Sequence, residues 1–331
     1  MREGRVVASS ADELLAGATE RSPLDSNGKS GARLETLVID GTRYVAKHLD
    51  DNDWSTRAAG VPGGAVIEMW RRGLLDLLPD CFNQPIIAVS GGAVPALLMR
   101  DVSAYLVPDV DEPVPAAQHE QFLTDMAALH AAFWRTSEPI DLVSVERRYL
   151  ELSPTMAQDE HRRGSDHPIP ALVARGWPVF AEVAPKAAAV VMPLLDDPAP
   201  LVRALATTPQ TFVHGNWKLD NIGTDDRGRT VILDWELPGR AAPLSDLAWY
   251  LAINCRRLPT SKETAIERYR SALEQHGIDT SGWWERQLGL CLLGALVQFG
   301  WEKALGGYDD ELAWWEEQAV RAESLLAGSE G

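Results

Sequence analysis

Two short apolar runs, each leading into polar residues, most constrain what this chain can fold into. Residues 211–221 read Thr-Phe-Val-His-Gly-Asn-Trp-Lys-Leu-Asp-Asn, and residues 231–236 read Val-Ile-Leu-Asp-Trp-Glu. Apolar, β-rich runs of this kind predict short strands, and Gly215 permits a tight backbone turn directly after the first run. The pattern therefore predicts a strand, a tight polar loop, a second short strand and an aspartate at its end.

The first hundred residues are rich in strand signals. Residues 33–39 and 43–49 alternate in polarity on either side of an Asp-Gly turn, which is a strong hairpin signal. Two more strands are predicted at 84–89 and 96–99, and a helix is predicted at 65–78. After residue 101 helical spacing dominates, with helices expected at 118–134, 144–151, 171–190, 199–206, 243–255, 261–276, 282–305 and 308–327. Strands first and helices afterwards predict a two-lobed α+β fold.

Length and charge exclude several classes of protein. The 331 residues suffice for two packed lobes, and a net charge of -17 argues against binding to nucleic acid or an anionic membrane. The three cysteines lie far apart without the spacing of a zinc site or a disulfide framework, so reduced thiols in the cytoplasm are expected. The N-terminus lacks an apolar signal segment, and the apolar run 287–301 is expected to form a buried helix rather than a membrane span. The sequence gives no indication of the oligomeric state.

Residues 211–236 resemble the catalytic segment of the aminoglycoside phosphotransferases, small-molecule relatives of the protein kinases. That family carries His-Gly-Asp, four residues, Asn, and then an Ile-Asp-Trp/Phe-Glu type segment about a dozen residues later, and the resemblance here extends from about residue 30 to 255. It implies a protein-kinase-like bilobal fold, with a nucleotide-binding lobe over 1–101, a hinge near 99–103 and a helical C-lobe over 102–331. The C-lobe would hold the catalytic loop and, in the helices after residue 260, the acceptor-binding surface.

The same resemblance assigns the residues that would bind the nucleotide. Lys47, in a Val-Ala-Lys strand context, would hold the phosphates of ATP or another purine triphosphate, and Glu68 on the following helix would pair with it. Glu35, on the neighbouring strand, is a competing partner for that lysine. A polar glycine turn at 26–31 would cover the phosphates. The hinge residues whose backbone would read the adenine edge are Met99, Arg100 and Asp101.

The catalytic segment supplies the residues that would hold metal and order the loop. Asn221 and Asp234 would bind Mg²⁺, which favours carboxylate and amide oxygens. His214 would brace the loop by hydrogen bonding, with a role as general base as the alternative. Asp246, at a helix start, would anchor the backbone of the catalytic loop.

One position departs from the family pattern, because Asn216 stands where the family carries its catalytic aspartate. Asparagine can orient a hydroxyl group but cannot take its proton at neutral pH, and a positioned base contributes roughly 10²–10⁴-fold. Asp220 is the nearest carboxylate that could replace it. The expected function is therefore that of an ATP- and Mg²⁺-dependent phosphotransferase acting on a small-molecule hydroxyl. Asn216 is the residue that would reduce or abolish this activity. The alternative is a catalytically weak or inactive nucleotide- or ligand-binding protein on the same scaffold.

The acceptor would be an aminoglycoside, an amino sugar or a related metabolite, as the resemblance implies. Trp217 and Trp249 lie in or beside the catalytic segments and would line its site. Acidic side chains would attract a cationic acceptor. The candidates are Glu236, Glu263, Glu267, Asp309, Asp310, Glu316 and Glu317.

Overall fold

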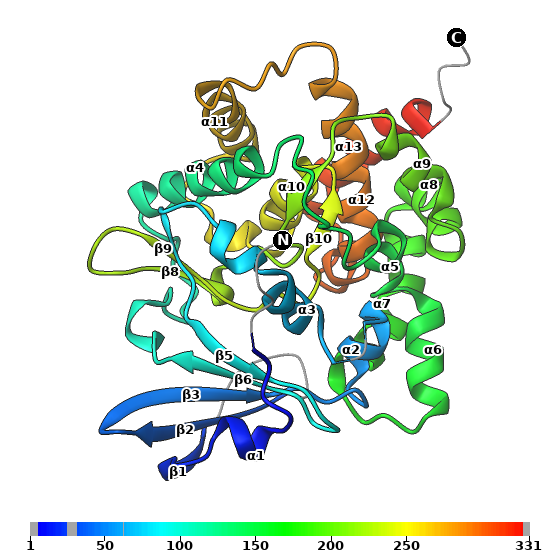
Figure 1. The fold of residues 1–331 in the computed structure, drawn as a ribbon. Helices are drawn as coiled ribbons and strands as arrows, with labels where there is room; N and C mark the ends of the chain where they lie inside the picture. Colours follow the sequence, from blue (N-terminus) through cyan, green and yellow to red (C-terminus); the bar gives the residue numbers. More distant parts are fainter. Residues whose placement is uncertain (1–5, 25–31, 62, 327–331) are drawn as a thin grey trace.

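The computed structural model describes residues 6–24, 32–61 and 63–326, and its strands and helices are segregated along the chain (Figure 1). The strand-rich end forms an antiparallel sheet in the order β1-β2-β3-β6-β5. The hairpin predicted at 33–49 is confirmed, because Asp40 and Gly41 both take the positive φ that a tight two-residue turn requires. The turn at 26–31 lies outside the described residues. The strands of this sheet are β1 (Thr19–Leu24), β2 (Arg33–Ile39), β3 (Thr42–His48), β5 (Ile86–Ser90) and β6 (Ala96–Arg100).

The two faces of this sheet contact different parts of the protein, because successive side chains along a strand point to opposite faces. Leu37, Ala46 and Leu98 form a small apolar cluster on the face that carries helix α1 (Ala11–Leu14). Lys47 and Leu97, which alternate with those residues, line a cavity on the other face. The hairpin and its partner strand thereby place one lysine at the cavity.

Two short helices, α2 (Trp54–Ala59) and α3 (Ala65–Arg72), connect β3 with the strands that follow. The helix predicted at 65–78 is interrupted at Gly73, whose φ of 67° ends α3 before the 3-10 turn Leu74–Leu77. Helix α2 also reaches the helical part of the chain. Its Arg57 Nε donates a 2.8 Å hydrogen bond to Glu160 of helix α6 (Pro154–Arg162).

Helices form most of the remainder, above the sheet in Figure 1. The helix predicted at 171–190 is in fact two, α7 (Pro168–Val183) and α8 (Pro185–Asp196), because Pro185 has no amide hydrogen to continue a helix and is suited to begin one. Helix α9 (Ala199–Ala206) has the predicted bounds. The other helices are α4 (Ala116–Ala132), α5 (Val145–Leu150), α6 (Pro154–Arg162), α10 (Leu244–Ile253), α11 (Lys262–Gln275), α12 (Trp284–Leu305) and α13 (Asp310–Leu326), with 3-10 turns at Ser103–Tyr105, Leu219–Asn221 and Cys255–Arg257.

Short strands frame the segment 211–236. Strand β7 (Thr211–Val213) pairs with β10 (Gly239–Ala241), and β8 (Ile222–Thr224) pairs with β9 (Thr230–Ile232). Strand β4 (Phe82–Asn83) pairs with β9 in parallel. Residues just before β5 and β6 of the large sheet therefore also pack against the segment 211–236. The strands predicted within 211–214 and 230–234 are confirmed, and β4, β8 and β10 were not predicted.

Helix α12 is the central helix of the C-terminal part and contacts α7, α10 and α13. Among the described residues it is the one helix whose length and composition would allow it to cross a membrane, yet 78% of its most apolar window is buried inside the protein. Burial against neighbouring helices accounts for its apolar character without a lipid environment.

Candidate active site

The backbone of the loop after β7 is held by one buried carboxylate. Asp246, in the first turn of α10, accepts hydrogen bonds from the backbone amides of His214 at 2.7 Å and Gly215 at 2.8 Å. Gly215 has a φ of 78°, and a Cβ atom there would lie 2.1 Å from the carbonyl oxygen of Leu237. Only glycine therefore fits this turn, and the anchoring task expected of Asp246 is confirmed.

His214 braces the loop from inside. Its Nε2 donates to the carbonyl oxygen of Leu233 at 2.9 Å, and its Nδ1 accepts from the backbone amide of Asn216 at 3.1 Å. Burial lowers the pKa of His214, which favours the neutral ring that this pair of bonds requires. Both ring nitrogens are thus occupied by the backbone, which favours the bracing interpretation over that of a general base.

A cavity of about 630 Å³ lies between the large sheet and the catalytic segment. Its lining includes eight of the residues that the sequence singled out. Those residues are Lys47, Met99, Asn216, Asp220, Asn221, Asp234, Glu236 and Trp249.

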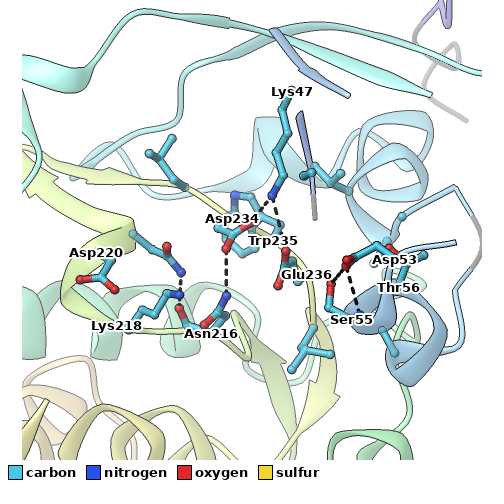
Figure 2. Close-up of a pocket in the computed structure, with 18 of the residues that line it drawn as sticks. Lys47, Asp53, Ser55, Thr56, Asn216, Lys218, Asp220, Asp234, Trp235 and Glu236 are labelled. Carbon is cyan, nitrogen blue, oxygen red and sulfur yellow. Dashed lines mark hydrogen bonds and ion pairs between the residues drawn. The ribbon is translucent and has the colours of Figure 1, made fainter. Parts of the chain in front are cut away.

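Lys47 extends across the cavity toward Asp234, which follows strand β9 (Figure 2). Its Nζ lies 2.6 Å from Asp234 Oδ1 and 3.5 Å from Glu236 Oε1. Burial alone would raise the pKa of Asp234, but the Lys47 and Lys218 cations outweigh it and hold that pKa at about 2. Burial and the adjacent Asp234 raise the pKa of Glu236. Asp234 is therefore a charged carboxylate at neutral pH, as a metal ligand must be.

The expected pairing of Lys47 with Glu68 is not present, so this prediction is wrong. Glu68 lies in the first turn of α3, where its carboxylate binds Arg72 at 2.7 Å and Arg71 at 3.6 Å. Residues three and four positions apart share one face of a helix, so these arginines are within easy reach of Glu68. Glu35, the competing candidate, pairs with Arg21 and His48 instead.

Asn216 lies beneath Asp234 in Figure 2 and is hydrogen-bonded to both Asp234 and Asn221. Asn216 Nδ2 donates to Asp234 Oδ2 at 3.1 Å, and Asn221 Nδ2 donates to the carbonyl oxygen of Asn216 at 3.0 Å. Asn221 thereby keeps its side-chain oxygen for a ligand in the cavity that Asp234 also lines. Two oxygen donors of these types fit Mg²⁺ that takes its other ligands from nucleotide phosphates and water. No cluster of three or more His, Cys, Asp or Glu in the described part of the chain could hold a metal ion alone.

Four other candidates lie outside this hydrogen-bonded group. Asp220 is exposed at the cavity edge, and Figure 2 shows it to the left of Lys218, away from Asp234. Met99 lines the cavity, as a hinge residue would. The side chains of Arg100 and Asp101 do not: Arg100 binds Asn83 at 2.7 Å, and Asp101 pairs with Arg43 at 2.8 Å.

The expected acceptor residues are only partly at the cavity. Trp249 and Glu236 line it, but Trp217 is fully buried and packs against Phe82 and His214, so its expected place at the acceptor site is corrected. The acidic residues expected after position 260 are also absent from the described lining. Those residues are Glu263, Glu267, Asp309, Asp310, Glu316 and Glu317.

Several charged residues at the cavity were not predicted, Lys218 and Glu151 among them. Lys218 lies two positions after Asn216 and acts on the titration of Asp234, Glu236 and Glu151. Its position in the loop was a signal that could have identified it. Glu151 follows α5, far from the catalytic segment in sequence, and no local pattern marks it.

Comparisons with known proteins agree with this geometry. A family model described as "Phosphotransferase enzyme family" matches residues 87–283, more than half of the chain. The structure of a microcompartment-associated aminopropanol kinase is similar with a TM-score of 0.52 and 11% identity, over 93% of this chain and 91% of that chain. This likeness confirms the kinase-like α+β fold and nothing finer.

Two further solved structures are similar at lower TM-scores. The macrolide 2′-phosphotransferase type I gives a TM-score of 0.47 and 18% identity, over 96% of this chain and 99% of that chain. The apo form of a thermostable mutant of the aminoglycoside phosphotransferase APH(4)-Ia gives 0.49 and 14%, over 96% and 98%. No curated protein matches the chain in sequence.

Proposed function

Because the chain belongs to the phosphotransferase enzyme family and is thus a small-molecule kinase, we propose that it uses ATP or another purine triphosphate with Mg²⁺. The acceptor is a hydroxyl group of an aminoglycoside, an amino sugar or a related metabolite. The observation that carries the proposal is the 2.6 Å ion pair of Lys47 with Asp234, since it brings the strand lysine and the candidate metal ligand to one cavity. The lobes are 1–101 for the nucleotide and 102–331 for catalysis, with the hinge near 99–103, and the protein acts in the cytoplasm.

Each residue has a task that follows from its position. When bound, a magnesium nucleotide supplies the phosphoryl group and neutralises its charge. Lys47 holds the phosphates, and Asp234 with Asn221 holds the metal. Lys218 adds a positive charge beside Asp234, where negative charge gathers during transfer. Catalysis of this kind depends mostly on positioning and electrostatics, because the transition state of phosphoryl transfer is loose.

Asn216 supports a second candidate, a catalytically weak or inactive kinase-like binding protein. Its Nδ2 donates to Asp234, so the position that would accept the hydroxyl proton carries a neutral amide engaged with the metal ligand. Its side-chain oxygen remains able to orient a hydroxyl group. Nucleotide binding is expected in both cases, and turnover separates them.

Thermal unfolding with nucleotides tests the proposal. Millimolar ATP, ADP or GTP with Mg²⁺ should raise the melting temperature, since a ligand that binds only the native state stabilises it. Asp234→Ala should remove the Mg²⁺-dependent part of the shift. Asp220→Ala is the matched control, because that exposed carboxylate stands apart from Lys47 and Asp234, and it should keep the shift. A wild-type protein that none of these nucleotides stabilises would refute the proposal.

A further inference from the structure

One part of the cavity is walled by aromatic side chains. Trp249 of α10 packs edge-to-face on Phe299 of α12, with ring centroids 4.7 Å apart. Both line the cavity together with Trp301, Trp235 and Leu152. Such a wall favours an apolar or aromatic molecule over a strongly hydrated one.

Three residues that line the same cavity carry buried polar atoms without partners. They are Oε2 of Glu151 and the indole Nε1 atoms of Trp235 and Trp249, in residues that are 7%, 2% and 7% exposed. Buried polar groups are nearly always hydrogen-bonded in folded proteins, so orphaned ones at a cavity call for a ligand. The carboxyl group of Glu151 requires a hydrogen-bond partner, and the two indole N–H groups require acceptor oxygens.

The raised pKa of Glu151 also indicates that its carboxyl group lacks a sufficient positive charge nearby. Burial raises the pKa of Glu151 to about 8, and the negative charges of Glu236 and, to a smaller extent, Asp234 act in the same direction. The positive charges of Lys218 and Arg148 act in the opposite direction. A carboxyl group in these surroundings ionises readily only when a further positive charge arrives. Glu302, which also lines the cavity, already has Lys303 at 3.1 Å.

We propose that Glu151 selects an acceptor with one amine on an apolar or aromatic body, whose oxygen atoms accept from Trp235 and Trp249. This deepens the proposed function and rests on it for the identity of the site. This narrows the proposed acceptors to the related metabolites, as an amphipathic amino alcohol in place of a polycationic sugar. The acidic residues expected after position 260 to attract a polycation lie outside the described lining, whereas the aromatic side chains of Trp249, Phe299 and Trp301 are part of it.

Matched small molecules separate the parts of this proposal. Calorimetric titration with 2-amino-1-phenylethanol, 1-phenylethanol and 2-aminoethanol compares the full probe with one lacking the amine and one lacking the ring. Wild-type protein should bind the full probe at least about tenfold more tightly than either analogue, and more tightly than hygromycin B. Glu151→Gln should weaken the full probe about tenfold and leave 1-phenylethanol unchanged.

Glu302→Gln is the matched control, because it makes the same change on the same cavity at a half-exposed, already paired carboxylate. It should alter binding by less than about twofold. Full affinity in Glu151→Gln, an equal loss in Glu302→Gln, or no binding of the full probe to folded wild-type protein would each overturn the proposal. The thermal shift with Mg²⁺ and ATP is measured on the same samples. If that shift is absent while the amine binds through Glu151, the proposed nucleotide function fails and this inference stands.

Discussion

Replacing Asn216 by aspartate should destabilise the ligand-free protein and increase its activity. The amide Nδ2 of Asn216 lies 3.1 Å from Asp234 Oδ2, so Asn216→Asp would set two carboxylates against each other. At that separation, with an effective dielectric constant of about 20, the repulsion is about 5 kcal/mol before compensation. Lys47 and Lys218 offset part of it, which leaves roughly 2–4 kcal/mol once the lost hydrogen bond is included.

This loss translates into a measurable melting shift. With an unfolding entropy of about 2.1 cal/mol/K per residue, a chain of this length should lose roughly 3–6 °C at neutral pH without Mg²⁺. Mg²⁺ with a nucleotide should restore the difference, because the metal neutralises both carboxylates. Turnover should then rise by at least about tenfold, since a base recovers part of a roughly 10²–10⁴ factor.

Asn216→Ala is the control, because it removes the hydrogen bond without adding charge. It should lose about 1–2 kcal/mol and show no additional rescue by Mg²⁺. If Asn216→Asp melts at the wild-type temperature without Mg²⁺, the contact with Asp234 is not as described. If turnover is unchanged in an already fast enzyme, another group takes the proton, and Asp220 would be tested first. Absence of turnover in both forms, with an acceptor known to bind, favours the binding protein.

Three other changes test the energetics of the site by thermal unfolding. Lys47→Met leaves the carboxylates of Asp234 and Glu236 without their cation, so stability should fall by about 2–4 kcal/mol at neutral pH and recover in part below about pH 4; an unchanged melting temperature would contradict the buried pair. Glu151→Gln tests a pH effect: the native state retains a proton on Glu151 between its ordinary pKa of 4.5 and about 8, where the unfolded chain has released it. Wild-type stability should therefore fall as pH rises through this window, by on the order of 2–4 kcal/mol relative to the variant, and parallel pH profiles would refute the burial of an uncompensated carboxyl. Gly215→Ala should cost more than about 3 kcal/mol because its Cβ meets the carbonyl of Leu237, and a stable, active variant would disprove that close approach.

Local signals in the sequence determined which parts of the structure could be predicted. The Asp-Gly turn specifies the β2–β3 hairpin because its residues favour positive φ, and the spacing of apolar residues identified most helices. Strand β4 escaped prediction because its two residues form a strand only by pairing with β9, almost 150 positions later. A similar limit applies to the break at Pro185, where an apolar pattern continued through two helices.

The candidate site shows the same division. Asn221, Asp234 and Lys47 occur in ordered motifs, so their meeting at one cavity could be expected. The partner of Glu68 depends on the rotation of α3 about its axis, which no motif specifies. In the structure Glu68 pairs with the nearby arginines of its own helix. Glu151 had no signal at all, since its role depends on the packing of α5 beside distant helices.

The central claim is a metal-nucleotide site formed by Asp234 and Asn221, and electron paramagnetic resonance with Mn²⁺ in place of Mg²⁺ tests it most directly. The free-ion signal should fall on adding protein only when a nonhydrolysable ATP analogue is present, because the two side chains complete a metal shell that phosphates begin. Asp234→Ala should abolish the loss of signal and Asn221→Ala should weaken it, while Asp220→Ala should match the wild type. Mn²⁺ that stays free with the nucleotide present, or that binds equally well to Asp234→Ala, would contradict the account.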